Sequence, residues 1–505
     1  MDTGTGTATH QALRYVAPSG ALVEEINWVD PEAAFLPHAD APMSLWLDSS
    51  DTAHEAARYS FIALAPYETL SFSAQNAKAG LAALDDKLAA HKTLWADLPP
   101  EIDHQLPPFR GGAAGLFGYD LGFGLDDAFD TENVAHAKEQ HAMTVGLYGS
   151  VLAFDHNAQR CFIIATGLPQ ENAAARADAA RQDISRWQNR LTGVPNQMLP
   201  PLASASPAAP LPGPLPALPQ SNFSKSAYCQ AVAHVVAHIL DGDIFQANLA
   251  QSFSAELSAD DDALSYYRRL RRIGAAPFSA FFRLTDRAIA SASPERFLLM
   301  ADGQVETRPI KGTQKRTTDP IEDAAVKAAL AASEKDRAEN VMIVDLLRND
   351  LAKNCRLNSI HVPQLCALES FANIHHLVST VQGEVKDNVS PVQVLADCFP
   401  GGSITGAPKI RAMQLIGEYE KTPRGASYGS LGYIGFDGRM DTNIIIRTAE
   451  IRGRQISFHV GGGIVADSMP QAEYIETLNK ARSLMGALGV DVDGYLADTK
   501  TGEVA

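Results

Sequence analysis

The sequence predicts an α+β protein whose sheets are mainly antiparallel. Three observations favour this class. Runs with the apolar and aromatic character of strands recur along the chain, glycine-containing turns separate many of them, and alanine-rich runs with helical spacing lie between the groups. At 505 residues the chain is too long for one ordinary core, so two domains or one large composite domain are expected.

The first 194 residues are predicted to combine strands and helices in one N-terminal part. Strands are predicted at 41–50, 148–155 and 160–166. Helices are predicted near 76–95 and 170–190. A glycine-rich stretch at 109–122 indicates backbone packed closely against another element. A phosphate-binding loop is not expected there, because no Gly-Lys-Ser/Thr motif follows.

Nine prolines between Pro195 and Pro219 predict an extended linker. A run this rich in proline cannot form a helix interior or a central strand. Residues 195–220 are therefore expected to separate an N-terminal part, 1–194, from a C-terminal part, 221–490, which is followed by a tail at 491–505.

The C-terminal part opens with a helix signal, since Ser224 precedes apolar residues at helical spacing. A long helix is predicted from Asp319–Pro320 towards Asp350, another after Gly402, and a last one from Pro470. Strands are predicted between these helices at 244–257, 279–284, 287–300, 304–310, 371–385, 429–438, 442–453 and 455–465.

Composition narrows the classes of function. A net charge of −17 argues against duplex nucleic acid as a partner, because binding it needs a positive face. A small anionic substrate stays compatible, since local lysine, arginine and backbone N–H groups can outweigh a distant net charge. The N-terminus lacks the features of a signal peptide and no apolar run reaches 18 residues, so a cytoplasmic protein is expected. The five scattered cysteines, without a CxxC motif, fit a reducing compartment and do not suggest zinc.

Two pairs of carboxylates stand three residues apart in predicted helices: Asp336 with Glu339, and Glu473 with Glu476. Each pair shares one helix face, and two such faces could meet around Mg²⁺, which prefers oxygen ligands. Acidic helix residues are common, so the spacing alone favours ordinary solvated faces.

Glycine and helix-start motifs offer places for an anion. Gly461, Gly462 and Gly463 follow a predicted strand and could turn N–H groups towards an anion, or form a bulge. Ser403 or Thr405 could cap the helix that follows, whose N-terminus would favour a carboxylate. On local grounds this motif is ordinary capping.

Three polar residues interrupt apolar runs. Arg447 lies in a predicted strand, where it needs a partner, and its planar fork suits a carboxylate. Glu295 ends an apolar run behind a proline, and a carboxyl buried there would have a raised pKa suited to a general acid. His376 could transfer protons or serve as a structural residue.

The stretch ETRPIKGTQKR sets Lys311 between a proline-led apolar step and a Gly-Thr turn. A lysine attacks only when neutral, so burial or nearby cations must lower its pKa. Lys315 and Arg316 are close in sequence. Most loop lysines do no chemistry, so the local pattern favours an ordinary lysine.

Taken together, residues 221–490 resemble the chorismate-utilising enzyme family. The matching motifs occur in family order: GDIFQANLAQSF, SASPERF, RPIKGT, AENVMIVDLLRNDL, HHLVSTV, FPGGSITGAPKIRAMQLI, GSLGYIGF, IIIRTAEI and GGGIVADSMPQAEYIETLNKARSL. A weaker N-terminal likeness, LWLDSS with ARYSFIA and PPFRGGAAGLFGYDLG, fits members that take ammonia from a glutamine amidotransferase. The resemblance implies two orthogonally packed antiparallel sheets flanked by helices, in α/β/β/α layers.

Two positions sort the reactions of this family. Members that activate water carry a lysine where this chain has Gln246, so Gln246 argues against water as the nucleophile at C2. Anthranilate-forming members carry alanine where this chain has Lys311, whereas members that form 4-amino-4-deoxychorismate carry lysine. The resemblance therefore implies a transaminase-type amination of chorismate at C4, through a covalent Lys311 adduct at C2, for p-aminobenzoate and folate synthesis. Anthranilate formation and a non-catalytic sensor of chorismate or an aromatic metabolite are the alternatives.

The resemblance also assigns roles to residues. Lys311 is implied as the nucleophile and Glu295 as the general acid or base. The implied Mg²⁺ ligands are Glu339 and Glu476, supported through water by Asp336 and Glu473. The implied substrate-binding residues are Gln246, Thr313, His376, Ser403, Tyr428, Arg447, Gly461, Gly462, Gly463 and Lys480.

The same resemblance bears on partners. The sequence shows no amidotransferase segment, so the use of glutamine implies a separate subunit, while free ammonia could serve alone. Ser49 and Arg58 resemble the segment that forms a tryptophan pocket in the family. A bound tryptophan, regulatory or structural, is implied there.

Overall fold

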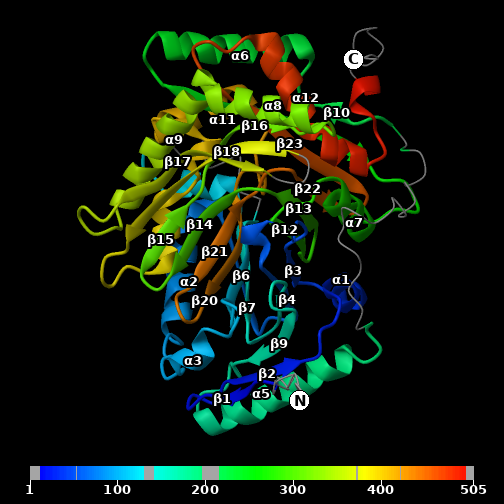
Figure 1. The fold of residues 1–505 in the computed structure, drawn as a ribbon, viewed down its shortest axis with the longest axis vertical. Coiled ribbons are helices and arrows are strands. Elements are labelled where there is room, and N and C mark those ends of the chain that lie inside the picture. The colour runs from blue at the N-terminus through cyan, green and yellow to red at the C-terminus, as the bar shows by residue number, and fades with distance from the viewer. Residues whose placement is uncertain are drawn as a thin grey trace, which may run out of the picture.

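A computed structural model describes residues 12–52, 54–129, 141–195, 215, 217–370, 374–420 and 422–495. Within these ranges the chain forms two large antiparallel sheets flanked by helices, which confirms the predicted α+β class (Figure 1). The predicted linker, 195–220, lies mostly outside the described residues, and the predicted tail, 491–505, lies partly outside them.

The first sheet has 13 strands among the described residues. Its order is β1 (Arg14–Val16), β2 (Leu22–Ile26), β9 (Arg160–Ala165), β8 (Ser150–Asp155), β4 (Tyr59–Ala63), β3 (Ser44–Asp48), β12 (Phe278–Arg283), β13 (Ala288–Ser293), β22 (Thr448–Arg452), β23 (Gln455–Ile464), β11 (Gln246–Glu256) and β10 (Gln220–Ser221). The short strand β19 (Gly406–Ala407) also pairs with β11.

The second sheet has 10 strands in the same part of the chain. Its order is β16 (Ile310–Lys315), β18 (Ile374–Glu384), β15 (Gln304–Thr307), β14 (Arg296–Ala301), β21 (Met440–Ile444), β20 (Ser430–Gly435), β6 (Gly112–Phe117), β7 (His141–Tyr148) and β5 (Glu68–Ser73). A further strand, β17 (His361–Ser370), pairs with β18.

Helices cover the sheets and gather at two ends of the molecule. The α-helices are α1 (Pro31–Phe35), α2 (Ala77–Ala89), α3 (Pro100–Asp103), α5 (Ala173–Arg190), α6 (Lys225–Leu240), α7 (Ala263–Ile273), α8 (Pro320–Ala332), α9 (Glu334–Ala352), α10 (Pro391–Cys398), α11 (Lys409–Glu420) and α12 (Pro470–Ala487). Short 3₁₀ helices are η1 (Leu36–His38), η2 (Glu55–Ala57), η3 (Ala74–Asn76), η4 (Tyr119–Gly124) and η5 (Gly402–Ile404). Helices α6, α11 and α12 lie at one end and α5 at the other (Figure 1). No helix in the described ranges has the length and apolar content required to cross a membrane.

The N-terminal and C-terminal parts build both sheets together. Strand β3 pairs with β12 in the first sheet, and β6 pairs with β20 in the second. Aromatic rings from both parts meet between the sheets, where Phe109 stacks on Tyr433 with ring centroids 4.6 Å apart. The predicted close approach at 109–122 is confirmed, because a Cβ on Gly112 would lie 2.3 Å from the Ile434 carbonyl oxygen.

One predicted helix is two helices in the structure. The long helix expected from Asp319 towards Asp350 is interrupted at Ser333, which ends α8 and begins α9. Ser333 has an extended ψ of 108°, and its side chain accepts a hydrogen bond from the Asp336 N–H. Serine favours such N-cap positions because its side chain satisfies a free backbone donor. The break sets the direction of α9, which carries Asp336 and Glu339.

Candidate active site

Two of the predicted residues lie where the chain passes from one sheet to the other. Glu295 lies between β13 and β14, and Arg447 lies between β21 and β22. Hydrogen bonds join these crossings, from Ile444 N to Glu295 O (3.0 Å) and from Ala292 N to Arg447 O (3.1 Å). The single strands predicted over 287–300 and 442–453 are wrong, because the chain changes sheets at Glu295 and at Arg447. The φ of Arg447 is 50°.

Glu295 is a buried carboxyl with one strong hydrogen-bond donor. It is 5% exposed, and the Ser403 hydroxyl donates to its Oε1 at 2.6 Å. Burial raises the pKa of Glu295, while the Ser403 hydrogen bond and the positive charge of Lys311 act in the opposite direction. The residue is therefore suited to hold and deliver a proton above the usual carboxyl range.

Ser403 and Thr405 do not cap a helix, so that prediction is wrong. The Thr405 hydroxyl donates instead to the Gly401 carbonyl at 2.8 Å. The short strand β19 follows and pairs with β11, and α11 begins only at Lys409. This turn holds Ser403 beside Glu295 and away from the helix N-terminus.

Lys311 lies on β16 with its amine next to the Ser403 turn. Its Nζ donates to the Ser403 carbonyl oxygen at 3.2 Å. Burial lowers the pKa of Lys311. The negative charge of Glu339 raises this pKa, whereas the positive charge of Lys480 lowers it further. No carboxylate in the described residues forms an ion pair with Lys311. A partly neutral amine is what a nucleophilic lysine requires.

Arg447 is close to a hydrogen-bonded pair formed by Thr313 and His376. These residues face each other across β16 and β18, and Thr313 Oγ1 lies 2.8 Å from His376 Nδ1. Burial lowers the pKa of His376 to about 3, and the positive charge of Arg447 acts in the same direction. His376 is thus neutral near pH 7. Among the described residues no carboxylate forms an ion pair with Arg447, so its guanidinium can receive an anionic ligand.

The two predicted carboxylates of α12 lie beside the glycine strand β23. A Cβ on Gly462 would lie 3.3 Å from Glu473 Oε2 and 3.5 Å from Glu476 Oε1. Lys480 pairs with Glu476 at 2.7 Å and donates to the Gly461 carbonyl at 2.9 Å. The Ser468 hydroxyl donates to Glu473 at 2.7 Å.

The charges of these carboxylates influence one another. Burial raises the pKa of Glu339 and of Glu473, and the neighbouring Glu476 raises both further. Lys480 lowers the pKa of Glu476. Asp336 belongs to the same group through its charge, although its carboxylate packs against Gly312.

This donor set is compatible with Mg²⁺. In the described part of the chain, no three His, Cys, Asp or Glu residues form a ready metal cluster. Mg²⁺ commonly takes only one or two carboxylates and keeps several waters. Glu339 and Glu476, from α9 and α12, repel each other electrostatically and would be stabilised by a cation between them.

Gln246 lies at the start of β11 beside the glycines. It is fully buried, and neither atom of its amide has a hydrogen-bond partner among the described residues. A Cβ on Gly463 would lie 2.7 Å from Gln246 Nε2, so a larger residue there would displace the Gln246 amide. A buried amide without partners indicates that a ligand or water completes its hydrogen bonds.

Tyr428 has an unusual backbone and lies beside the Arg447 crossing. Its φ is 65°, and its N–H donates to the Ile445 carbonyl at 2.7 Å. Tyr428 and Arg447 both occupy the left-handed region, which is rare for residues other than glycine and concentrates at functional sites. The structure thus brings the predicted catalytic, substrate-binding and acidic residues into one neighbourhood.

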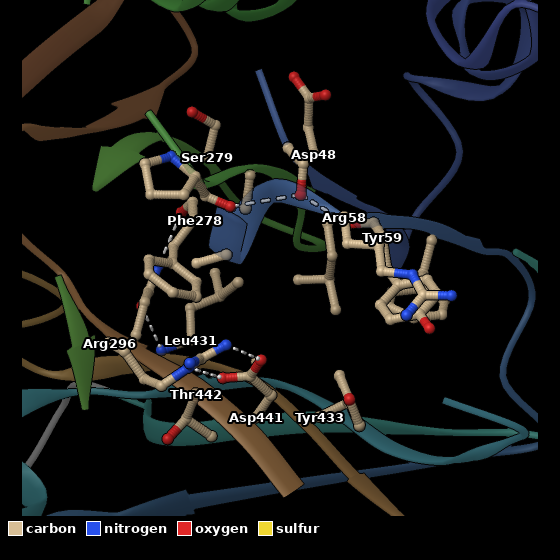
Figure 2. Close-up of a pocket in the computed structure, with 18 of the residues that line it drawn as sticks. Asp48, Arg58, Tyr59, Phe278, Ser279, Arg296, Leu431, Tyr433, Asp441 and Thr442 are labelled. Carbon is tan, nitrogen blue, oxygen red and sulfur yellow. Dashed lines mark hydrogen bonds and ion pairs between the residues drawn. The ribbon is translucent and has the colours of Figure 1, made fainter. Parts of the chain in front are cut away.

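A cavity of about 320 Å³ lies between the sheets, and the two residues predicted for a tryptophan pocket are part of its lining. Its lining includes Ser49 and Arg58 with the rings of Phe278 and Tyr433. Figure 2 shows Arg58 and Tyr59 on one side of this cavity, and the ion pair of Arg296 with Asp441 on the other. The Ser49 hydroxyl donates to the Tyr59 carbonyl at 2.6 Å, and Arg58 pairs with Asp155 at 2.7 Å.

Three buried residues next to the site escaped the sequence patterns. Arg424 pairs with Glu420 at 2.6 Å, and its guanidinium carbon lies 4.4 Å from the ring centroids of Tyr119 and Tyr428. The only hint in the sequence is the spacing of four between Glu420 and Arg424, which is also common on exposed helices. Tyr119 comes from the N-terminal part, so no local pattern could place it here.

Comparisons with known proteins all indicate the same protein family. The chorismate binding enzyme family matches residues 43–486. Aminodeoxychorismate synthase component 1 of Salmonella typhimurium is 40% identical over 91% of this chain and 96% of its own length. The protein of the same name from Escherichia coli is 37% identical over 88% of this chain and 93% of its own length. Anthranilate synthase component 1 of Bacillus subtilis is 36% identical over 90% of this chain and 89% of its own length.

Solved structures share the fold. Anthranilate synthase component I from Streptococcus pneumoniae superposes with a TM-score of 0.68 at 29% identity, covering 85% of this chain and 92% of the other. The menaquinone-specific isochorismate synthase of Escherichia coli has a TM-score of 0.66 at 18% identity, and the match covers 95% of this chain and 96% of the other. The family match spans most of the chain, and the relatives share 36% to 40% of their residues with it. The chain therefore belongs to the chorismate binding enzyme family.

Proposed function

We propose that this protein aminates chorismate at C4 with ammonia and forms 4-amino-4-deoxychorismate. The observation that carries the proposal is the amine of Lys311, which is half-buried, has no ion pair among the described residues, and lies 3.2 Å from the Ser403 carbonyl. Relatives named aminodeoxychorismate synthase component 1 support the same assignment. The product belongs to p-aminobenzoate and folate synthesis, and we place this step in the cytoplasm.

The reaction follows from two allylic displacements. The neutral Lys311 amine forms a bond to C2 of chorismate, both conjugated double bonds of the ring shift by one position, and the C4 hydroxyl leaves as water with a proton from Glu295. Ammonia then forms a bond to C4, both double bonds shift back, and the lysine leaves C2 as an amine. Glu295 takes up one proton in this second step. Splitting the substitution in two lets the protein hold each leaving group in turn.

The remaining residues bind and orient the substrate in this proposal. Arg447 holds the enolpyruvyl carboxylate with its guanidinium fork, and Tyr428 lies beside it. The backbone of Gly461, Gly462 and Gly463 receives the ring carboxylate through the N–H groups that point away from β11, and Lys480 adds a positive charge. The amide of Gln246 completes its hydrogen bonds with the substrate, while Thr313, His376 and Ser403 line the pocket.

Mg²⁺ enters the proposal through Glu339 and Glu476, with Asp336 and Glu473 supporting it through water. When bound, a divalent cation supplies positive charge for the ring carboxylate and the departing hydroxyl. The protein's contribution is to bring carboxylates from α9 and α12 to the two sides of one site.

A metal titration tests this assignment independently of activity. Saturating Mg²⁺ is expected to raise the unfolding temperature of the wild type, because a ligand at 100 times its Kd stabilises the folded state by about 2.7 kcal/mol. Glu476→Gln is expected to lose most of this rise. Glu334→Gln, on the exposed start of α9, is the matched control and should keep it. An equal rise in both variants would place the cation elsewhere.

Ammonia reaches the site from a partner or from solution. The name component 1 in the relatives supports a second component, and we propose a glutamine amidotransferase subunit for this role. Free ammonium is expected to serve in its absence. The product assay therefore supplies chorismate, Mg²⁺ and ammonium, with and without an added aminodeoxychorismate lyase. Formation of p-aminobenzoate only with the lyase supports the proposal.

The strongest alternative is anthranilate synthase, which the Bacillus subtilis relative and the Streptococcus pneumoniae structure favour. Fluorescent anthranilate formed without the lyase would decide for it. A non-catalytic sensor is the other alternative. It would bind chorismate tightly and show no turnover even with an amidotransferase supplied.

We further propose that the cavity between the sheets binds tryptophan or a similar aromatic amino acid. Its aromatic walls suit an indole, and Ser49 and Arg58 lie at its edge. Tryptophan is expected to raise the unfolding temperature of the wild type. Leu431→Trp fills the cavity and should abolish this rise, whereas Leu357→Trp, at a leucine that is 91% exposed, should keep it. An unchanged response of Leu431→Trp would contradict the site.

A further inference from the structure

A buried arginine behind the candidate active site contacts three of its parts at once. Arg424 is 3% exposed and forms an ion pair with Glu420, which is equally buried. Taking such a pair out of water is costly unless every donor and acceptor is satisfied. The contacts of Arg424 show what this burial achieves.

Two of these contacts fix backbone next to proposed substrate-binding residues. Arg424 Nη1 donates to the Ile404 carbonyl at 3.0 Å, directly after Ser403 in the turn. Arg424 Nη2 donates to the Asn248 carbonyl at 2.6 Å, two residues after Gln246. One planar guanidinium thus sets the spacing between the Ser403 turn and the start of β11.

The third contact is with Tyr428 itself. The guanidinium carbon lies 4.4 Å from the Tyr428 ring centroid, within the range of a cation–π interaction. Tyr119 lies at the same distance from it. Because Tyr428 has a φ of 65°, its backbone conformation needs support from surrounding contacts.

The N-terminal part holds this arrangement in place. The Asp120 carboxylate accepts the Gly425 N–H at 2.9 Å, and the Tyr119 N–H donates to the Gly425 carbonyl at 2.9 Å. The Glu420 carboxylate also accepts the Ala250 N–H at 2.8 Å, which ties the pair to the middle of β11. Residues from η4, α11 and β11 therefore converge on one side chain.

We infer that Arg424 is a positioning residue for chorismate, which it holds indirectly through Tyr428, the Ser403 turn and the start of β11. Tyr119 acts with it, so the N-terminal part contributes to the geometry of a site whose reacting groups come from the C-terminal part. The inference rests on the proposed placement of chorismate at Tyr428 and Ser403. Lysine cannot replace this arginine, because it lacks the planar fork that bonds two carbonyls while facing a ring.

The test compares steady-state kinetics of variants with saturating ammonium and Mg²⁺. Arg424→Lys is expected to raise the KM for chorismate about tenfold with a smaller change in kcat, since the reacting groups remain in place. Arg411→Lys, at a half-exposed arginine on the same helix as Glu420, is the matched control and should match the wild type. Tyr119→Leu should raise the KM in the same direction. Tyr119→Phe keeps the ring and should restore most of the affinity.

A double substitution distinguishes positioning from general stability. If Arg424 acts through Tyr428, Arg424→Lys adds little to the KM of a Tyr428→Leu protein. A full tenfold increase in that background, or a wild-type KM for both Arg424→Lys and Tyr119→Leu, overturns the inference. Should Arg424→Lys fail to fold, Tyr119→Leu and its Phe counterpart decide. The same assay identifies the wild-type product, so an anthranilate product would refute the proposed function and leave the KM comparison valid.

Discussion

Replacing Lys311 by alanine is expected to lower the rate of 4-amino-4-deoxychorismate formation by about 100-fold or more when ammonia is limiting. The amine is the proposed nucleophile, and its removal leaves only direct displacement of the C4 hydroxyl by ammonia. The folded structure should tolerate the change, because Lys311 has no ion pair among the described residues and a single hydrogen bond to the Ser403 carbonyl. The KM for chorismate should change much less than kcat.

Mass spectrometry gives the most direct measurement of this role. Wild-type protein treated with chorismate without ammonia is expected to carry an adduct on the peptide that contains Lys311. The Lys311→Ala protein should lack it. Lys315→Ala removes an exposed lysine on the same strand and serves as the control, since it should retain both adduct and activity. Wild-type rates in Lys311→Ala under limiting ammonia would contradict the nucleophile role.

The position of Lys311 shows how far the sequence can predict the site. The motif identified the residue, but the surroundings that lower its pKa come from distant segments. The neighbouring cation is Lys480, from α12, whereas Lys315 is exposed at the far end of β16 and Arg316 pairs with Asp323. Proximity in sequence was thus a poor guide to proximity in space, because four strand residues separate Lys311 from Lys315 by roughly 13 Å. A bulge between Lys311 and Thr313 also interrupts the alternation of side chains between the two faces.

The strand and helix pattern predicted the α+β class and most elements, but it could not show where the chain changes sheets. Residues 442–453 have one continuous apolar pattern, although the pairing of β21 and β22 with different sheets breaks it at Arg447. The register of each strand is set by partners far away in sequence. For the same reason, Arg424 and Tyr119 could not be connected before the fold was known, since they stand 305 positions apart and only packing joins them.

Glu295→Gln is expected to lower kcat by about 10² to 10⁴-fold, the usual contribution of a general acid or base. Glutamine keeps the shape of the side chain and an oxygen that can accept the Ser403 hydroxyl, but it has no proton to deliver to the departing C4 hydroxyl. The KM for chorismate should stay within a small factor of the wild type. Glu384→Gln, at an exposed glutamate on β18, is the control and should be fully active. Full activity in Glu295→Gln would mean that a group other than Glu295 delivers the proton.

The same substitution is expected to stabilise the folded protein above the usual carboxyl range of pH, and this separates a chemical role from a structural one. Burial raises the pKa of Glu295, so between the ordinary carboxyl pKa and the raised value the folded state keeps a proton that the unfolded state has released. The free energy of unfolding therefore falls as pH rises through that window and stays lower above it. A glutamine side chain does not titrate. Glu295→Gln should therefore unfold at a higher temperature than the wild type at pH 8, and the difference should disappear as the pH falls below the ordinary carboxyl pKa.

Unfolding temperatures measured across this range, together with kcat, check both effects. A variant that is inactive and also less stable at pH 8 would show that Glu295 serves the fold, whereas an inactive and more stable one is what a buried acid kept for catalysis requires.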